Sequence, residues 1–240
     1  MAIEFRNVVA GYSPTLTILH ELSFVARKGD VTLLIGPNGA GKSTALKALF
    51  GLLVPRSGEI RLDDEVTSGV PPRKMLEKGV AFVPQGRNLF GGLSVLHNLE
   101  LGGITLASDT LRRERIEEVL ARFPRIRERQ HNQASTLSGG EQKQLEVGRA
   151  LLLRPRVLLI DEPSIGLSPI ISQDVFRLLR SLADEGTTVL MVEQNVRSAL
   201  TYADRALVLE MGRLALDRPA AELLRDPDLN RLFLGGGRRS

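Results

Sequence analysis

Gly36-Pro37-Asn38-Gly39-Ala40-Gly41-Lys42-Ser43 fits the pattern Gly-x-x-x-x-Gly-Lys-Ser. It follows an apolar run at residues 31–35 and leads into a predicted helix from Thr44 to Gly51, so the pattern has the strand–loop–helix setting of a phosphate-binding loop. The glycines let successive backbone amides point at phosphate oxygens, aided by the positive end of the helix. We therefore predict that residues 36–44 bind a nucleotide, with Lys42 at its β- and γ-phosphates and Ser43 ligating Mg²⁺.

Two acidic residues end another predicted strand farther along the chain. Residues 157–160 are apolar and are followed by Asp161 and Glu162. Carboxylates next to a buried strand are costly unless they serve an ion or a proton transfer. We expect Asp161 to hold Mg²⁺, directly or through water, and Glu162 to polarise the attacking water. Asp63-Asp64-Glu65 has no partner motif, and we expect it to be a solvated turn.

A third motif, Leu137-Ser138-Gly139-Gly140-Glu141, lies between the first two. Ser138 and Glu141 have the Ser-x-x-Glu spacing of a capping box, which predicts a helix that starts here and runs to about residue 152. A capped helix start with two glycines offers free amides to an anion, as the phosphate loop does.

The hydrophobic pattern alternates between strands and helices. This order predicts an α/β fold with a largely parallel sheet covered on both faces. The strand–helix alternation is interrupted at residues 86–136, which we interpret as an inserted helical segment. Ser94 caps one helix there, and Asp109 or Thr110 starts another. The predicted strands are 3–8, 22–26, 31–35, 58–62, 80–83, 157–160, 187–192 and 205–209, and the later helices are 170–185 and 196–202.

The composition is that of an ordinary soluble protein, with 42% hydrophobic and 25% charged residues. The chain has no cysteine, and its three histidines are too scattered to form a metal cluster. No stretch approaches the roughly 20 apolar residues of a membrane-spanning helix, so we expect a protein neither secreted nor integral to a membrane. The net charge of +4 could indicate a nucleic acid or an anionic membrane surface as a partner, but we interpret it as the solvated surface of a nucleotide-binding protein.

In chain order, the motifs at Gly36–Ser43, Leu137–Glu141 and Asp161-Glu162-Pro163, with a helical insert between the first and the second, resemble those of the ATP-binding-cassette (ABC) ATPases over essentially the whole chain. The resemblance implies a single P-loop NTPase domain over residues 1–240. Residues 1–85 and 137–234 would form the core with an N-terminal antiparallel β-subdomain, residues 86–136 a helical subdomain and residues 235–240 a tail.

The resemblance also implies roles for single residues. Two cassettes, identical or different, would face each other head to tail, so that Ser138, Gly139 and Gly140 contact the γ-phosphate of ATP held by the partner. Tyr12 would stack on the adenine. Gln85 would touch Mg²⁺ or the lytic water and sense the transporter.

Two positions depart from the commonest pattern of these ATPases. Ser168 stands where many cassettes have an aspartate that makes a contact across the dimer. Gln194 stands where most have a histidine that contacts the γ-phosphate. Glutamine can donate a hydrogen bond but cannot carry the charge of an imidazolium, so we expect hydrolysis to be retained but slower or differently regulated.

Further strings narrow the resemblance to the second ATPase of branched-chain amino-acid importers, the LivF type. They include Val83-Pro84-Gln85-Gly86-Arg87, Val192-Glu193-Gln194-Asn195 and Leu234-Gly235-Gly236. This type implies transmembrane permease subunits, indirectly a periplasmic or extracellular solute-binding protein, and a peripheral place on the cytoplasmic face of the cell membrane. Importers of urea or short amides share nearly all of these strings, so the substrate is not readable from the chain.

Three alternatives remain at this stage. A lipopolysaccharide-export cassette shares much of the same framework. A cassette acting on nucleic acid or ribosomes would have a second cassette, a coiled-coil insertion or a basic arm; the sequence has none of these, and no nucleic-acid partner is expected. Gln194 suggests a regulatory protein that binds ATP without turnover, but Glu162 argues against it.

Overall fold

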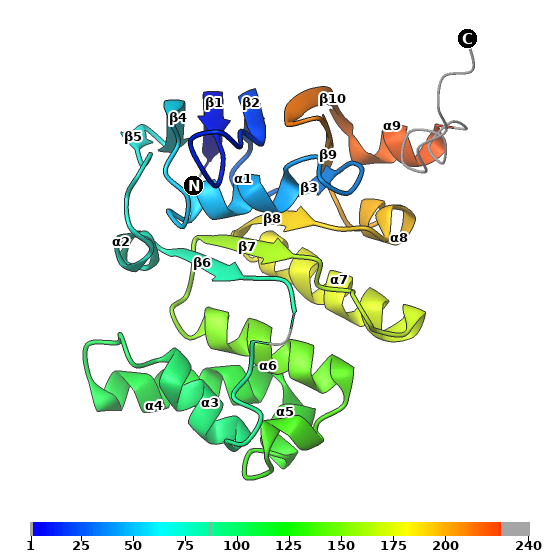
Figure 1. The fold of residues 1–240 in the computed structure, drawn as a ribbon. Coiled ribbons are helices and arrows are strands. Elements are labelled where there is room, and N and C mark those ends of the chain that lie inside the picture. Colours follow the sequence, from blue (N-terminus) through cyan, green and yellow to red (C-terminus); the bar gives the residue numbers. More distant parts are fainter. Residues whose placement is uncertain (1, 87, 227–240) are drawn as a thin grey trace.

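Two β-sheets and a set of helices are stacked in layers (Figure 1). The structure is a computed structural model and describes residues 2–86 and 88–226. One sheet is ordered β2-β1-β4-β5 and the other β10-β9-β3-β8-β7-β6. The strands are β1 (Ile3–Ala10), β2 (Leu19–Ala26), β3 (Val31–Ile35), β4 (Ser57–Leu62), β5 (Glu65–Val66), β6 (Val80–Val83), β7 (Val157–Asp161), β8 (Thr188–Val192), β9 (Arg205–Glu210) and β10 (Arg213–Pro219). The helices are α1 (Lys42–Leu49), α2 (Pro72–Glu77), α3 (Val95–Gly102), α4 (Asp109–Arg122), α5 (Pro124–Glu128), α6 (Gly139–Leu151), α7 (Pro169–Asp184), α8 (Val196–Leu200) and α9 (Ala220–Arg225), with a 3₁₀ turn at Ala134–Thr136.

The larger sheet is the core sheet, and five of its six strands are parallel, as predicted. Strands β3, β7 and β8 are buried along their whole length, because helices or the second sheet cover both faces. The carboxyl ends of neighbouring parallel strands meet at one edge, so the loops after β3, β7 and β8 are brought together there. Within this register Asp161 lies beside Val192.

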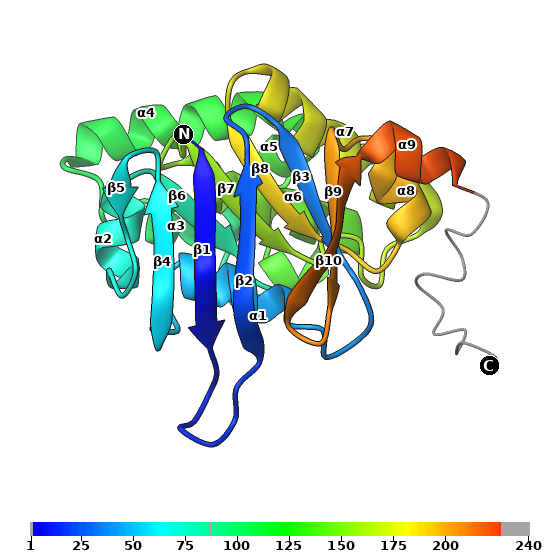
Figure 2. The ribbon, with the colours of Figure 1, turned by 90° about the horizontal axis from the view of Figure 1, so that it is seen from above.

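Side-chain alternation divides the hydrophobic core into two clusters. Leu33 and Ile35 of β3 point into one cluster, and Leu34 between them points into the other. Helix α1 fills the second cluster, between the core sheet and the antiparallel sheet, whereas α6 and α7 pack on the opposite face (Figure 1). Figure 2 shows the antiparallel strands β1, β2 and β4 lying across the top of the core sheet.

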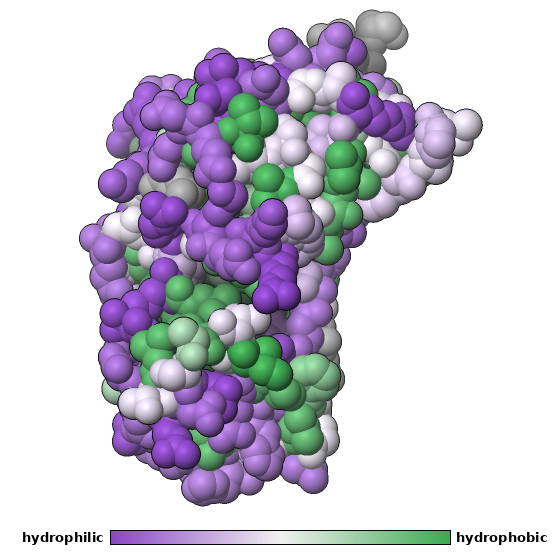
Figure 3. Space-filling model, turned by 90° about the vertical axis from the view of Figure 1, so that its left-hand side faces the viewer, coloured by the Kyte–Doolittle hydropathy of each residue, from purple (hydrophilic) through white to green (hydrophobic). Residues whose placement is uncertain are grey.

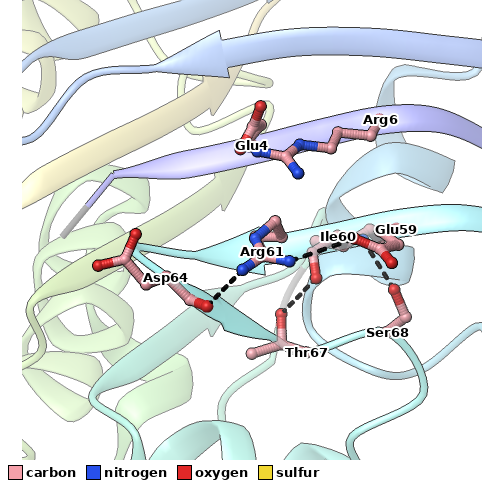
Figure 4. Close-up of polar contacts among 8 residues, drawn as sticks. All are labelled: Glu4, Arg6, Glu59, Ile60, Arg61, Asp64, Thr67 and Ser68. Atoms are coloured by element: carbon pink, nitrogen blue, oxygen red, sulfur yellow. Dashed lines mark hydrogen bonds and ion pairs between the residues drawn. The ribbon is translucent and has the colours of Figure 1, made fainter.

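The antiparallel sheet carries alternating charges on its outer face. Glu4 of β1 lies opposite Arg61 of β4, and Arg6 lies opposite Glu59, while the ion pairs themselves form within each strand, between Arg6 and Glu4 and between Arg61 and Glu59 (Figure 4). The turn after β4 begins at Asp63, whose φ of 51° is left-handed. The Asp63 carboxylate accepts a hydrogen bond from the Ala2 amide, and Asp63, Asp64 and Glu65 are exposed, in agreement with the expected solvated turn.

The inserted segment is helical, as expected. Ser94 caps α3, and α4 starts at Asp109 with Ser108 as its cap. The polar stretch near residues 122–133 contains the short helix α5. These helices pack against α6 through apolar residues such as Val119, Phe123 and Leu145.

Several elements were not anticipated or differ in length. Strand β1 extends to Ala10, and β2 begins at Leu19, three residues before the predicted start. The prediction omitted α2, α9, β5 and β10; β10 is an edge strand ending at Pro219 with only alternate residues partly buried, which gives a weak apolar signal. Residues 227–234 of the predicted core and the predicted tail at 235–240 lie outside the described residues. No helix in residues 2–86 and 88–226 is long and apolar enough to cross a membrane.

Candidate active site

The loop between β3 and α1 is tightly curved and packs closely against strand β9. Gly36, Gly39 and Gly41 all have positive φ angles, which glycine adopts without strain. A Cβ at Gly36 would lie 2.1 Å from the carbonyl oxygen of Leu209 in β9. No side chain therefore fits at this position, and the loop is held against the neighbouring strand.

Lys42 lies at the start of α1 and turns back over the loop. Its ammonium donates to the carbonyl oxygens of Gly36 and Pro37 at 2.8 and 2.9 Å. Burial lowers the pKa of the Lys42 ammonium, while the carboxylates of Glu162 and Asp161 act in the opposite direction. A cation is thus held over the concave side of a loop that presents backbone amides, an arrangement suited to a polyphosphate.

Asp161 and Ser43 meet between β7 and α1. The Ser43 hydroxyl donates to Asp161 Oδ1 at 3.1 Å, and Asp161 is 2% exposed. Burial raises the pKa of the Asp161 carboxyl, and the hydrogen bond from Ser43 opposes that rise. A hydroxyl beside one carboxylate fits Mg²⁺, which is usually bound by one or two carboxylates together with phosphates and waters. No cluster of three or more His, Cys, Asp or Glu residues suited to a metal occurs in the described part of the chain.

Glu162 is held by two glutamine side chains. Gln85 Nε2 donates to Glu162 Oε2 and Gln194 Nε2 donates to Glu162 Oε1, both at 2.6 Å. The Glu162 backbone is left-handed, with a φ of 48°, and its amide donates to the carbonyl of Val192. The carboxylate is therefore fixed from both sides by loops that follow β6 and β8.

Tyr12 lies beside the first turns of α1. Its hydroxyl is 3.3 Å from Thr44 Oγ1 and from Lys47 Nζ, and the Lys47 ammonium lies 5.4 Å from the ring centroid. The tyrosine is 52% exposed, so its ring is open to a stacking partner next to the phosphate loop. Lys47 was missed in the sequence, although it lies one helical turn after Ser43 and therefore on the same face of α1.

Ser138, Gly139 and Gly140 form the start of α6, far from the chain's own phosphate loop. Helix α6 lies on the opposite face of the core sheet from α1 (Figure 1). The predicted capping box is present: the Ser138 amide and hydroxyl both donate to Glu141 Oε2 at 2.8 Å, and the Glu141 amide donates back to Ser138 Oγ. Ser138 and Gly139 are exposed, so the amide-bearing helix start faces outward.

The loop that carries Gln85 is tied to α6 by a buried ion pair. Lys143 and Glu146 are 2.5 Å apart with side chains 7% and 4% exposed. Glu146 also accepts the backbone amide of Asn88 at 2.9 Å, and Arg149 donates to the Asn88 carbonyl at 2.6 Å. These residues lie outside the sequence motifs, although Lys143 and Glu146 have the helical i, i+3 spacing of an ion pair.

Glu193 was quoted in the sequence only as part of a string, yet it is buried between two loops of the site. It is 2% exposed and accepts hydrogen bonds from Ser164, Gln194 and Asn195. The available signal was the one used for Asp161, a carboxylate that directly follows a fully buried strand. Ser168, which replaces the commoner aspartate, precedes α7, and its carbonyl accepts the Ser172 hydroxyl.

Comparison with known proteins gives consistent results over nearly the full length of the chain. The family described as ABC transporter matches residues 19–165. The chain is 44% identical to the high-affinity branched-chain amino acid transport ATP-binding protein BraG of Pseudomonas aeruginosa, over 95% of this chain and 97% of that protein. It is 38% identical to the probable branched-chain amino acid transport ATP-binding protein LivF of Archaeoglobus fulgidus, over 94% and 95%. A solved ATP-binding cassette of an ABC transporter in its ADP conformation superposes with a TM-score of 0.88 at 27% identity, covering 98% of this chain and 99% of that one.

Proposed function

The chain belongs to the family of ABC transporter ATP-binding proteins and is an ATPase of that family, and from this premise we propose that it is the ATP-hydrolysing subunit of a branched-chain amino-acid importer. One observation carries the catalytic part of the proposal. The carboxyl ends of the parallel strands β3 and β7 bring Lys42, Asp161 and Glu162 to one edge of the sheet, where Gln194 after β8 meets Glu162.

Each residue has a role that follows from its position. Lys42 and the amides of residues 36–44 hold the β- and γ-phosphates, and Tyr12 stacks on the adenine. Glu162 accepts a hydrogen bond from the attacking water and aligns it with the γ-phosphate. Gln85 and Gln194 hold both carboxylate oxygens at 2.6 Å, so the position of Glu162 follows the two loops that carry the glutamines.

Ser43 and Asp161, with Gln85 nearby, are the residues that would hold Mg²⁺. When bound, the ion would neutralise charge on the phosphate oxygens. Burial of Asp161 supports this role, because a carboxylate that is 2% exposed with a single hydroxyl donor is available to a cation.

Two chains complete the site. Cassettes of this family work as dimers together with transmembrane subunits. The helix start at Ser138 and Gly139 is exposed and lies on the opposite side of the sheet from its own phosphate loop, which supports a contact of residues 138–140 with the γ-phosphate in a partner cassette, identical or different. Closure around two ATP molecules links dimerisation to nucleotide binding.

A groove beside the Gln85 loop supports the coupling to a membrane subunit. It has a volume of about 400 Å³ and lies between α2, β6, α3 and α6. Figure 3 shows apolar side chains gathered in the hollow between the upper and lower parts of this face. Leu101 and Ile104 on its rim are 38% and 67% exposed. Because Pro84 and Asn88 line the groove and flank Gln85, a segment seated there is in position to move the glutamine that holds Glu162.

The proposed setting is the cytoplasmic face of the cell membrane, peripheral to a permease. The identity to BraG and LivF supports branched-chain amino acids as the cargo, with the solute-binding protein acting indirectly. No observation favours the alternatives of lipopolysaccharide export, urea or amide import, or a non-transport role. The subunits that copurify with the tagged chain, and leucine uptake by cells lacking the chain, test the cargo.

Hydrolysis itself is tested with the Glu162→Gln variant. We expect it to lower kcat by a factor of about 100 or more while nucleotide binding persists, and removal of Mg²⁺ by a chelator to stop turnover. Glu114→Gln is the matched control, because Glu114 is exposed on α4. Wild-type turnover in the Glu162→Gln variant would contradict the proposed role of this carboxylate.

A further inference from the structure

Glu193 is a buried carboxylate that the proposed chemistry does not use. It follows β8 directly and is 2% exposed. No ion pair joins it to a lysine, arginine or histidine within residues 2–86 and 88–226. A buried charge without a cation is costly unless hydrogen bonds compensate it.

Four donors surround the Glu193 carboxylate. The Ser164 amide donates to Oε1 at 2.7 Å, and the Ser164 hydroxyl donates to Oε2 at 2.8 Å. The amides of Gln194 and Asn195 also donate to Oε2, at 3.0 and 3.2 Å. Burial raises the pKa of Glu193, and the hydrogen bonds from Ser164, Asn195 and Gln194 act against that rise.

These donors come from two different loops. Ser164 belongs to the loop between β7 and α7, which continues to Ser168. Gln194 and Asn195 belong to the loop between β8 and α8, and the Gln194 amide group reaches Glu162. Glu193 is the residue that joins the backbones of both loops through one side chain.

We propose that Glu193 is a positioning residue that locks residues 163–168 to Gln194, so that the seating of this loop against a partner cassette sets the hydrogen bond from Gln194 to Glu162. The inference rests on the proposed roles of Glu162 and Gln194. It assigns to Glu193 no contact with ATP or with the attacking water.

The chemistry requires a carboxylate at this position. A glutamine of the same shape has one oxygen and one NH₂ group, so it cannot accept from donors on both sides. In Glu193→Gln, at least one amide or hydroxyl would face another donor, and one of the two loops would be released.

The test is a double-mutant cycle on the full-length chain, measured as kcat, KM and ATP affinity. We expect Glu193→Gln to lower kcat by a factor of about 10 with less than a twofold change in ATP affinity. In the Gln194→Ala background the same change should lower kcat by less than about twofold, because the residue through which it acts is already missing. Ser164→Ala, which removes one donor and keeps the backbone, should show a smaller loss with the same dependence on Gln194.

The outcomes separate the inference from the function on which it rests. Wild-type kcat in Gln194→Ala would remove the proposed role of Gln194 and the inference with it. A lowered kcat in Gln194→Ala, combined with wild-type kcat in both Glu193→Gln and Ser164→Ala, would overturn the inference alone. An equal fold-loss from Glu193→Gln in both backgrounds would show a general structural effect and would also overturn it. Thermal unfolding of each variant identifies losses that come from misfolding; if Glu193→Gln fails to fold, Ser164→Ala decides the test.

Discussion

At the scale of single residues, Gln194 is the feature that distinguishes this site. Its amide donates to Glu162 at 2.6 Å, so it holds the carboxylate in place. A histidine could make a similar contact and could also carry a positive charge near the γ-phosphate. The glutamine retains the positioning contact and forgoes the charge.

Substitution of Gln194 by histidine should preserve or raise turnover. The imidazole retains a donor, and its protonated form would add charge stabilisation near the phosphate. We expect kcat between the wild-type value and about 10 times that value, measured by phosphate release under saturating ATP. A complete loss of activity would show that the amide has a role that imidazole cannot supply, and Gln194→Ala provides the reference for a side chain with no donor.

At the scale of elements, helix α6 combines an exposed N-terminus with a buried ion pair. Lys143 and Glu146 lie one turn apart, and the carboxylate also holds the Asn88 amide on the Gln85 loop. A charge buried to this extent is tolerated because its partner is present.

Lys143→Met should destabilise the chain by about 3 kcal/mol, because it removes the ammonium that is paired with the buried Glu146 carboxylate. Adding Glu146→Gln should recover part of the loss, since the neutral amide can still accept the Asn88 amide. Urea denaturation with an unchanged m-value measures both variants. Strictly additive losses would contradict the interpretation of the pair as a coupled unit.

The capping box of α6 should make stability depend on pH. Burial tends to raise the pKa of Glu141, but the hydrogen bonds from Ser138 and the nearby arginines outweigh it, so the pKa lies below its ordinary value of 4.5. The ionised carboxylate therefore contributes stability above pH 4.5, and this contribution is lost as the pH falls through the lower folded-state value. Glu141→Gln should lower the free energy of unfolding by about 1 kcal/mol near neutral pH. This difference should shrink as the pH falls below 4.5. Glu114→Gln, a change at an exposed position of α4, is the control variant measured in parallel.

Local patterns anticipated the parts of the site that lie within one motif. The phosphate loop, Asp161-Glu162 and the Ser138 cap were predicted because each is set by neighbouring residues and by the end of a strand or the start of a helix. The contacts of Glu193 with Ser164 could not be predicted, since they join residues 29 positions apart and depend on how two loops pack. Strand β10 was missed because it is largely exposed, and helix α2 because it is short and largely exposed, so tertiary packing determines both elements more than the hydrophobic pattern does.

At the scale of the whole molecule, the catalytic machinery is divided between two faces. Lys42 and Ser138 lie on helices that pack on opposite sides of the core sheet. We propose that one chain holds two half-sites, and that each is completed by a half-site from a partner.

Ser138→Ala should reduce turnover while leaving ATP binding to the isolated chain nearly unchanged, because the phosphate loop is untouched. Ser108→Ala is the matched control, since it removes an equivalent serine cap from α4, away from the site. A mixture of Ser138→Ala and Lys42→Ala chains should regain activity, because one of the two sites in the mixed dimer contains neither change. Absence of this complementation, with both chains folded and dimeric, would contradict a shared site.

The central position of β3 in the sheet determines when the nucleotide-binding loop can fold during synthesis. Strand β3 lies between β8 and β9, and the Val31 amide donates to Asp204, 173 positions later. Gly36 of the phosphate loop packs against the carbonyl of Leu209, and the Gly212 amide donates to the Ala40 carbonyl. A nascent chain thus exposes its nucleotide loop long before the strands that support it have left the ribosome. Folding must wait for non-local strand pairing, which is slow. The risk of aggregation is therefore greatest while the edge of the incomplete sheet is still exposed.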